Sequence, residues 1–248
     1  MFEWIRTALG IIRSVRIYYG DRARAAAMDR LHTRFVRRGD LVFDIGAHVG
    51  DRVASFRRLG ARVVAVEPQP AMVKVLKLFY GRSADVAIEM QAVGRKAGTT
   101  SMMINVDNTT VSSASLDFID AAREAPGWKK QRWTRSVSVR LTTLDELIDR
   151  HGLPAFIKID VEGFEAEVLA GLTHAVNALS FEFTTIQRDV ALACIERCVA
   201  MGYTRFNAAL GEGQNFVNAD WVGSEEIVRW LTGLPYAANS GDVYAALR

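Results

Sequence analysis

The sequence predicts an α/β fold in which a doubly wound, mostly parallel sheet carries helices on both faces. Short apolar stretches such as Leu41–Ile45 and Arg62–Val66 alternate with longer stretches of helical character. This alternation is typical of parallel strands joined by crossover helices. The strand stretches are also apolar on nearly every residue, as expected for strands that helices cover on both sides.

Glycines end the first two helices of this series, at Gly60 and Gly81, as they do at many helix C-termini. Small polar residues dominate between residues 109 and 125, so we expect an irregular segment there, of the kind that forms lids and substrate loops. The other expected elements are strands at Leu41–Ile45, Arg62–Val66, Val86–Val93, Thr99–Asn105, Val137–Leu141, Ala155–Asp160, Leu179–Phe183 and, as a closing hairpin, Tyr203–Ala208 with Asn215–Val217, and helices at Asp51–Leu59, Pro70–Tyr80, Leu144–His151, Glu165–Leu172 and Asp189–Met201.

The first 38 residues form a helical appendage in this interpretation, and residues 39–248 form the cofactor-binding domain. Apolar residues recur at helical spacing from Phe2 to Tyr19, with arginines between them. Residues 1–40 contain nine arginines and four acidic residues. Such a helix can lie on an anionic membrane surface, or it can pack against the domain or a second subunit.

The composition excludes some classes of function and favours others. A net charge of +3, concentrated near the N-terminus, does not indicate a nucleic-acid partner. Cys194 and Cys198 lack a nearby histidine or further cysteine that would complete a metal site. No signal-peptide pattern precedes the domain, and the two thiols suit a reducing compartment. We therefore expect a cytoplasmic protein, with membrane association at the inner face as an open alternative.

A glycine-rich turn from Asp44 to Gly50 follows the first strand, with the sequence Asp-Ile-Gly-Ala-His-Val-Gly. Gly46 permits a tight turn against which a ligand can lie, and Gly50 lets the next helix approach closely. The spacing differs from the Gly-x-Gly-x-x-Gly turn that binds a pyrophosphate. The turn therefore predicts a nucleoside cofactor without a phosphate, S-adenosylmethionine, whose ammonium group Asp44 can hold.

Two further strand ends complete the predicted cofactor site. Glu67 ends the second strand, where an acidic side chain can accept hydrogen bonds from both hydroxyls of a ribose. Gln91 and Ala92 lie at the end of the third strand, beside the expected position of the adenine. The predicted cofactor-binding residues are Asp44, Ile45, Gly46, Ala47, His48, Gly50, Glu67, Pro68, Gln91, Ala92 and Asp160.

A second group of acidic residues begins at the end of the predicted strand Ala155–Asp160. Asp160 lies at the carboxyl end of this strand, where open α/β sheets bind ligands, and Glu162 lies two residues further on. Glu182 interrupts another apolar strand and is expected to converge with them. We predict Asp160 or Glu162 as the general base, with His48 as the third possibility, and we expect Lys158 to pair with one of the acids.

These motifs resemble those of the FkbM-type methyltransferases over residues 41–185. The resemblance rests on Asp44–Gly50, Val66–Pro68, Gln91–Gly94, Thr143–Asp145 and, above all, Ile157–Glu165 with Leu169 and Gly171. It implies a seven-stranded sheet whose last strand is antiparallel, and O-methylation of a hydroxyl group on a sugar, a glycan or a secondary metabolite. His48 stands where many relatives have asparagine, which leaves its role open.

Other functions compatible with the motifs are an NAD-dependent oxidoreductase on a similar sheet and a non-catalytic cofactor-binding module. The absent third glycine of the phosphate turn disfavours the first, and the complete set of site residues disfavours the second. A small-molecule or glycan acceptor is expected, with Trp128 and Trp133 as residues that stack on it. The sequence predicts no metal site, although Asp160 and Glu182 are oxygen donors of the kind that Mg²⁺ prefers.

Overall fold

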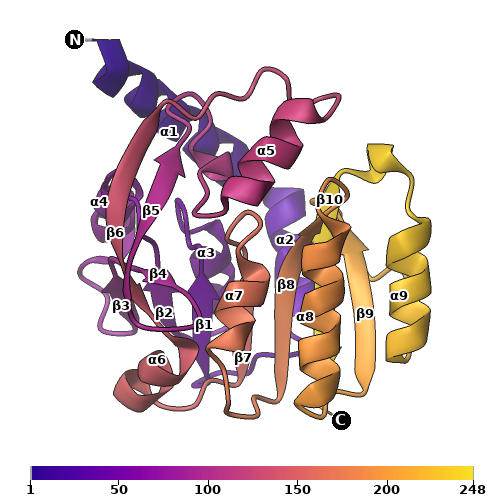
Figure 1. Cartoon of the computed structure of the whole chain (residues 1–248). Coiled ribbons are helices and arrows are strands. Elements are labelled where there is room, and N and C mark those ends of the chain that lie inside the picture. Colours follow the sequence, from indigo (N-terminus) through magenta and orange to yellow (C-terminus); the bar gives the residue numbers. More distant parts are fainter. Residues whose placement is uncertain (1, 248) are drawn as a thin grey trace.

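The computed structural model describes residues 2–247, with side chains from Thr7 onward. Its centre is a seven-stranded sheet in the order β3-β2-β1-β7-β8-β10-β9. Neighbouring strands are parallel except for β10, which runs antiparallel to β8 and β9. The predicted fold class is therefore confirmed, including the antiparallel last strand (Figure 1). The strands of this sheet are β1 Leu41–Ile45, β2 Arg62–Val66, β3 Val86–Glu89, β7 Phe156–Ile159, β8 Ala178–Thr184, β9 Arg205–Leu210 and β10 Ser240–Ala246.

Helices cover both faces of this sheet and bury an apolar core on each side. One core contains side chains of α2, α3 and α4, such as Leu31, Phe56 and Leu76. The other contains side chains of α6 to α9, such as Leu147 and Ile227. The α-helices are α1 Phe2–Gly20, α2 Arg22–His32, α3 Asp51–Arg58, α4 Pro70–Tyr80, α5 Leu116–Glu124, α6 Leu144–His151, α7 Glu165–Ala170, α8 Arg188–Ala200 and α9 Ser224–Gly233.

A smaller sheet, in the order β4-β6-β5, lies beside the first. Its strands are β4 Ala92–Val93, β5 Gly98–Ile104 and β6 Arg135–Thr142. The prediction of a single third strand over Val86–Val93 was wrong, because the chain leaves the main sheet after Glu89 and pairs with β6 from Ala92 onward. The sequence from Val86 to Val93 contains no glycine or proline that would indicate this change of partner.

Two other expectations for the chain were wrong. The segment 109–125 contains a short 3₁₀ helix, Thr109–Val111, and the helix α5, whose N-terminus Ser115 caps by accepting a hydrogen bond from the Phe118 amide. The expected hairpin of 203–208 with 215–217 does not form a strand pair, although the Val217 amide donates to the Ala208 carbonyl at 2.8 Å. Instead β9 pairs with β10, and α9 lies between these two strands in the chain. The strand β10 was not predicted, because it contains small residues that do not favour strands (Gly241, Ala245 and Ala246).

The N-terminal segment forms two helices, and the second is part of the core. Asp21 separates them by capping α2, where its side chain accepts from the Arg24 amide. His32 stacks on Phe56, and Phe35 stacks on Phe156 of β7, so residues 22–36 pack directly against the main sheet. The side chains of Phe2, Trp4, Ile5 and Arg6, which belong to the amphipathic pattern, lie outside the described ones.

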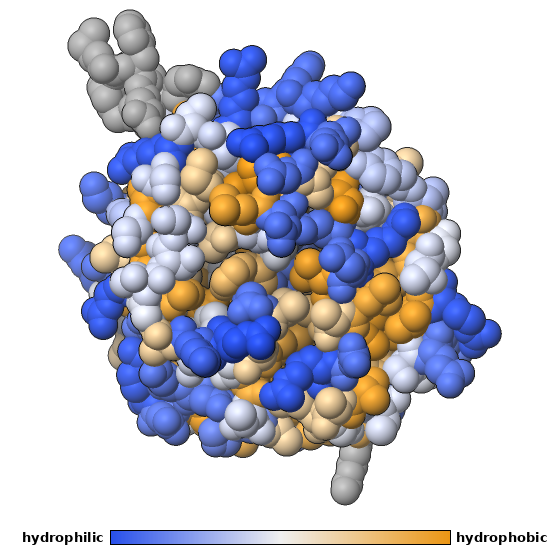
Figure 2. Space-filling model, viewed as in Figure 1, coloured by the Kyte–Doolittle hydropathy of each residue, from blue (hydrophilic) through white to orange (hydrophobic). Residues whose placement is uncertain are grey.

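The surface viewed in Figure 2 is hydrophilic around much of its rim and more hydrophobic toward its middle. Over the residues that the structure describes, none of the helices combines the length and apolar character needed to cross a membrane.

Candidate active site

The turn after β1 forms one wall of a cavity at the carboxyl edge of the main sheet. Three residues of this turn have positive φ angles, Gly46 (86°), His48 (45°) and Gly50 (85°). The amides of Gly46 and Ala47 both donate to the carbonyl of Val66, which holds the turn against the end of β2. Only glycine fits at position 46, because a Cβ there would lie 1.8 Å from the carbonyl oxygen of Asp160.

Asp44 lies at the base of the cavity and is 1% exposed. Its Oδ2 has no hydrogen-bond partner among the described residues. Burial raises the pKa of this carboxyl from its usual value of 3.8 to about 7. A buried carboxylate without a donor is costly, and a ligand that brings an ammonium group into the cavity would relieve that cost.

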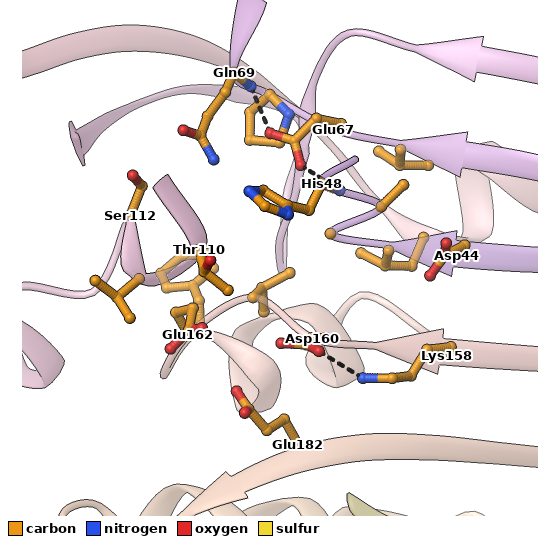
Figure 3. Close-up of a pocket in the computed structure, with 18 of the residues that line it drawn as sticks. Asp44, His48, Glu67, Gln69, Thr110, Ser112, Lys158, Asp160, Glu162 and Glu182 are labelled. Carbon is orange, nitrogen blue, oxygen red and sulfur yellow. Dashed lines mark hydrogen bonds and ion pairs between the residues drawn. The ribbon is translucent and has the colours of Figure 1, made fainter. Parts of the chain in front are cut away.

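Glu67 follows β2 on the same wall, above the turn in Figure 3. Its Oε2 accepts from the His48 amide at 2.9 Å, and its Oε1 accepts from the Gln69 amide at 2.8 Å. Burial raises the pKa of Glu67 to about 7. Each oxygen keeps a lone pair, so the carboxylate can still accept hydrogen bonds from two hydroxyl groups of a ligand.

The opposite wall carries acidic residues from the loop after β7 and from β8. Asp160, Glu162 and Glu182 offer carboxylate oxygens that lie within 4.8 Å of one another. The loop that follows β7 is held by Glu165, whose Oε1 accepts from the amides of Val161 and Gly163. Glu162 has a positive φ of 56°, an uncommon conformation for a residue with a side chain, which the hydrogen bonds of Glu165 support.

The pKa values of the three acids shift in different directions, because Asp160 is the one that forms an ion pair with Lys158. Lys158 donates from Nζ to Oδ2 of Asp160 at 2.9 Å and lies 3.1 Å from Oδ1 of Asp242. The predicted pairing of Lys158 with an acid is therefore confirmed. Burial opposes the ionisation of Asp160, but the Lys158 ammonium outweighs it and lowers the pKa of Asp160. Burial and the charge of Asp160 raise the pKa values of Glu162 and Glu182 well above their usual range.

His48 faces the cavity from the turn. Its Nε2 lies 3.0 Å from the hydroxyl of Thr109, and the ring of Tyr18 stands at its edge. Burial lowers the pKa of His48 to about 4, so the imidazole is neutral at pH 7. A neutral ring that is oriented by Thr109 is well suited to a hydrogen bond with a ligand.

Nearly all of the predicted cofactor-binding residues line this one cavity, and so do the predicted catalytic residues. Gly50 is the exception, because it directly precedes α3 and lies near Leu76 and Tyr80 outside the lining. Gln91 lies in the lining and donates to Glu89 at 3.1 Å. The predicted residues in the lining are Asp44, Ile45, Gly46, Ala47, His48, Glu67, Pro68, Gln91, Ala92, Asp160 and Glu162.

The lid or substrate loop expected within residues 109–125 does contribute to the cavity, and so does Trp128, but the sequence did not single out Thr110, Ser112 or Asn239 as lining residues. Thr110 lies near Glu162 in Figure 3, and Ser112 follows it in the lining with its hydroxyl accepting from the Asn105 amide. Trp128 also lines the cavity and donates to Asn239, whereas the predicted stacking residue Trp133 lies outside the lining and donates to the Val111 carbonyl. No spacing in the sequence links residues 110, 128 and 239, so only the fold could bring them together.

An ion-pair network at the cavity was also missed. Arg24 at the start of α2 contacts Asp51 at 2.8 Å and Glu212 at 2.6 Å, and Arg52 contacts the same two carboxylates at 2.6 Å and 3.3 Å. Arg52 and Lys158 are the Lys or Arg residues in the lining, and both are already ion paired. Seven carboxylates share this lining: Asp44, Asp51, Glu67, Asp160, Glu162, Glu182 and Glu212.

Comparison with known proteins identifies the family. The model of the methyltransferase FkbM domain matches residues 44–227, which include both walls of the cavity. The chain belongs to the FkbM methyltransferase family. Hexuronic acid methyltransferase AglP from Haloferax volcanii is 26% identical over 187 residues, which cover 71% of this chain and 72% of that protein.

Solved methyltransferase structures are similar at lower identity. Fibrillarin from Aeropyrum pernix, with bound S-adenosyl-L-methionine, has a TM-score of 0.47 at 10% identity and covers 89% of this chain and 73% of that one. Magnesium protoporphyrin IX methyltransferase from Synechocystis, also with the cofactor, has a TM-score of 0.45 at 9% identity and covers 96% of this chain and 84% of that one.

This FkbM protein is a methyltransferase whose cofactor is S-adenosylmethionine. The cavity suits that cofactor for a physical reason. Its lining is rich in carboxylates and its Lys and Arg side chains are already paired, so it favours a ligand that brings an ammonium and a sulfonium group. A dinucleotide would bring a pyrophosphate, and the Lys and Arg side chains of the described lining, Arg52 and Lys158, are already paired with carboxylates. The match to a methyltransferase family speaks against the two alternatives, a nicotinamide enzyme and a non-catalytic module.

Cofactor affinity is expected to fall as the pH drops through about 7, because a protonated Asp44 cannot attract the cofactor ammonium. The folded state raises the pKa of Asp44, so the contribution of Asp44 to the stability of the cofactor-free protein falls as the pH rises from about 4 to about 7. Asp44→Asn should weaken binding roughly 10- to 100-fold and flatten this pH dependence.

Titration calorimetry with S-adenosylhomocysteine, which keeps the ammonium group, measures both effects across this pH range. Asp149→Asn, in an exposed position on α6, is the matched control and should leave affinity and pH dependence unchanged. Equal affinities for the parent and Asp44→Asn at every pH would remove Asp44 from the cofactor site.

Proposed function

We propose that this enzyme transfers the methyl group of S-adenosylmethionine to a hydroxyl group of a sugar or glycan. The observation that carries the proposal is the set of three carboxylates on one wall, of which only Asp160 is kept ionised by a lysine. The ionised Asp160 can accept a proton from a hydroxyl group, while the raised pKa values of Glu162 and Glu182 favour their neutral forms, which donate hydrogen bonds to the acceptor.

In this proposal the cofactor binds the wall formed by the Asp44–Gly50 turn and Glu67, which faces the three acids. Asp44 holds its ammonium group, Glu67 accepts from the ribose hydroxyls, and the backbone and side chain of Gln91 and Ala92 lie beside the adenine. Gly46 lets the cofactor lie against the backbone of the turn. When bound, the cofactor supplies a methyl group on a sulfonium, which needs no further activation by the protein.

The contribution of the protein is then alignment and proton removal. His48 and Thr110 flank the space between the two walls and are placed to orient the acceptor and the cofactor (Figure 3). Holding the acceptor oxygen in line with the methyl group can lower the barrier by up to roughly 7–11 kcal/mol. Asp160 takes the hydroxyl proton. Before this transfer, the Lys158 ammonium keeps the carboxylate of Asp160 ionised.

A sugar is favoured as the acceptor by the lid and by the relative. The half-buried ring of Trp128 lines the cavity, and aromatic rings stack on the apolar faces of sugars. The similar protein from Haloferax volcanii is named as a hexuronic acid methyltransferase. In the carboxylate-rich cavity of this chain, hydroxyl groups of a sugar would find many acceptors.

Mass spectrometry of glycans and metabolites from cells that lack the gene tests this proposal. We expect a glycan that has lost the mass of one CH₂ group, and we expect the purified enzyme with S-adenosylmethionine to restore it. Loss of a methyl group from a protein, a nucleic acid or an amine, with unchanged glycans, would overturn the proposed acceptor class.

A further inference from the structure

The helices α1 and α4 expose apolar side chains on one side of the molecule. Leu9 and Ile12 of α1 are 60% and 61% exposed, and Leu78 of α4 is 80% exposed. Ile17, Tyr19 and Phe79 extend the same surface, and the rings of Tyr19 and Phe79 are in contact. These two helices carry half of the large hydrophobic side chains that the described chain exposes, so the surface is a concentrated patch.

A groove between the two helices adds apolar area to this surface. Ile11 of α1, with Val75 and Leu78 of α4, lines one part of it, and Ile104 and Val137 of the small sheet line its floor. Figure 1 shows α1, α4 and the small sheet on the same side of the molecule. We call this whole region, formed by residues 7–20, α4, β5 and β6, the α1–α4 face.

The charge of the α1–α4 face has one sign. Its forty residues include six Lys or Arg and, in sequence, no Asp or Glu. The chain as a whole has nearly as many acidic as basic residues, so this segregation sets the face apart. The cations are Arg13, Arg16, Lys74, Lys77, Arg135 and Arg140, and all are exposed.

We infer that the α1–α4 face binds the surface of an anionic lipid bilayer. Exposed Leu and Ile side chains between Arg and Lys are the combination by which interfacial helices bind membranes, with apolar groups in the acyl boundary and cations at the headgroups. A second copy of this chain is a poor occupant, because two such faces would bring like charges together. A nucleic acid would match the cations, but it would leave the apolar patch without a partner.

The position of the face gives this binding a consequence for the enzyme. Gln69 lines both the groove and the active-site cavity, and its Nε2 donates to the Thr109 carbonyl at 3.2 Å. Tyr18, on the inner side of α1, lines the active-site cavity. A bilayer that binds the α1–α4 face would therefore lie next to the active site, while the inference itself does not depend on which acceptor is methylated.

Sedimentation of the full-length protein with vesicles tests this inference. We expect the protein to sediment with vesicles that contain phosphatidylserine and phosphatidylcholine, to bind pure phosphatidylcholine at least about tenfold more weakly, and to be released by salt. Replacing the apolar residues (Leu9→Glu, Ile12→Glu, Leu78→Glu) or the cations (Arg13→Gln, Arg16→Gln, Lys74→Gln, Lys77→Gln) should each reduce binding at least about tenfold.

The matched control is Leu153→Glu, an equally exposed leucine in the loop before β7, which should bind like the parent. Melting temperatures establish that every variant is folded. Failure of the parent to bind anionic vesicles, or full binding by either set of variants, would overturn the inference. So would a dimer in solution that the apolar replacements dissociate, or preferential binding to an oligonucleotide. Cofactor affinity of the variants should equal that of the parent, so this test is independent of the proposed reaction.

Discussion

Gly46→Ala is expected to lower the affinity for S-adenosylmethionine by at least about 100-fold. The added Cβ would lie 1.8 Å from the carbonyl oxygen of Asp160 and 2.9 Å from its carbonyl carbon, both of which are backbone atoms. The positive φ of 86° adds roughly 1–2 kcal/mol of strain for a residue with a side chain. The turn and the loop after β7 must move apart, and the two walls of the cavity separate with them.

Calorimetry with S-adenosylhomocysteine and thermal unfolding measure this effect. Gly39→Ala is the matched control, because Gly39 has a φ of 88° but no atom within 4 Å of an added Cβ. It isolates the cost of the backbone conformation, and its cofactor affinity should be unchanged. If Gly46→Ala bound the cofactor as tightly as Gly39→Ala, the contact between the turn and Asp160 would have no role in shaping the site.

Asp160→Asn is expected to reduce kcat by roughly 10²- to 10⁴-fold. Asparagine keeps the shape of the side chain but cannot accept the hydroxyl proton, and it leaves Lys158 with one carboxylate neighbour instead of two. Initial rates with labelled S-adenosylmethionine and the glycan from cells that lack the gene measure the loss. Cofactor affinity is measured in parallel, so that a binding defect is separated from a defect in the methyl transfer itself.

Glu182→Gln is the informative comparison for this variant. Burial and the charge of Asp160 raise the pKa of Glu182 well above its usual range and so favour its neutral form, which an amide should replace with less than a tenfold loss. Equal losses in the two variants would contradict a single base at Asp160. They would indicate that the acids act as one set, and a loss of activity after treatment with a chelator, restored by Mg²⁺, would then identify that set as ligands of a cation.

The sequence was most informative where one short segment carries the whole arrangement. The turn from Asp44 to Gly50 follows its strand directly, and the positive φ angles of Gly46 and Gly50 are conformations that glycine adopts without strain. The acids at Asp160 and Glu162 were found for the same reason, since they follow a buried strand at the sheet edge where ligands bind.

The errors came where pairing partners lie far apart in the chain. A hairpin was expected after Tyr203, but β9 pairs with β10, some thirty residues further on, after α9. The chain after Glu89 changes from one sheet to another without a change in its apolar pattern. Local periodicity indicates that a strand exists, whereas its neighbours depend on loops and on packing with the rest of the fold.

The sequence by itself therefore determined the fold class, the family and the chemistry of the two strand ends that form the walls. Only the tertiary structure decided how these walls differ in charge. Asp160 is ionised because Lys158 lies beside it, and Asp44, Glu67, Glu162 and Glu182 have raised pKa values because they are buried. Burial and the distance between charges are properties of three-dimensional packing, and the one-letter order does not contain them. The glycine turn that predicts the cofactor is thus readable in the sequence, while its close approach to Asp160, which joins the two walls, is not.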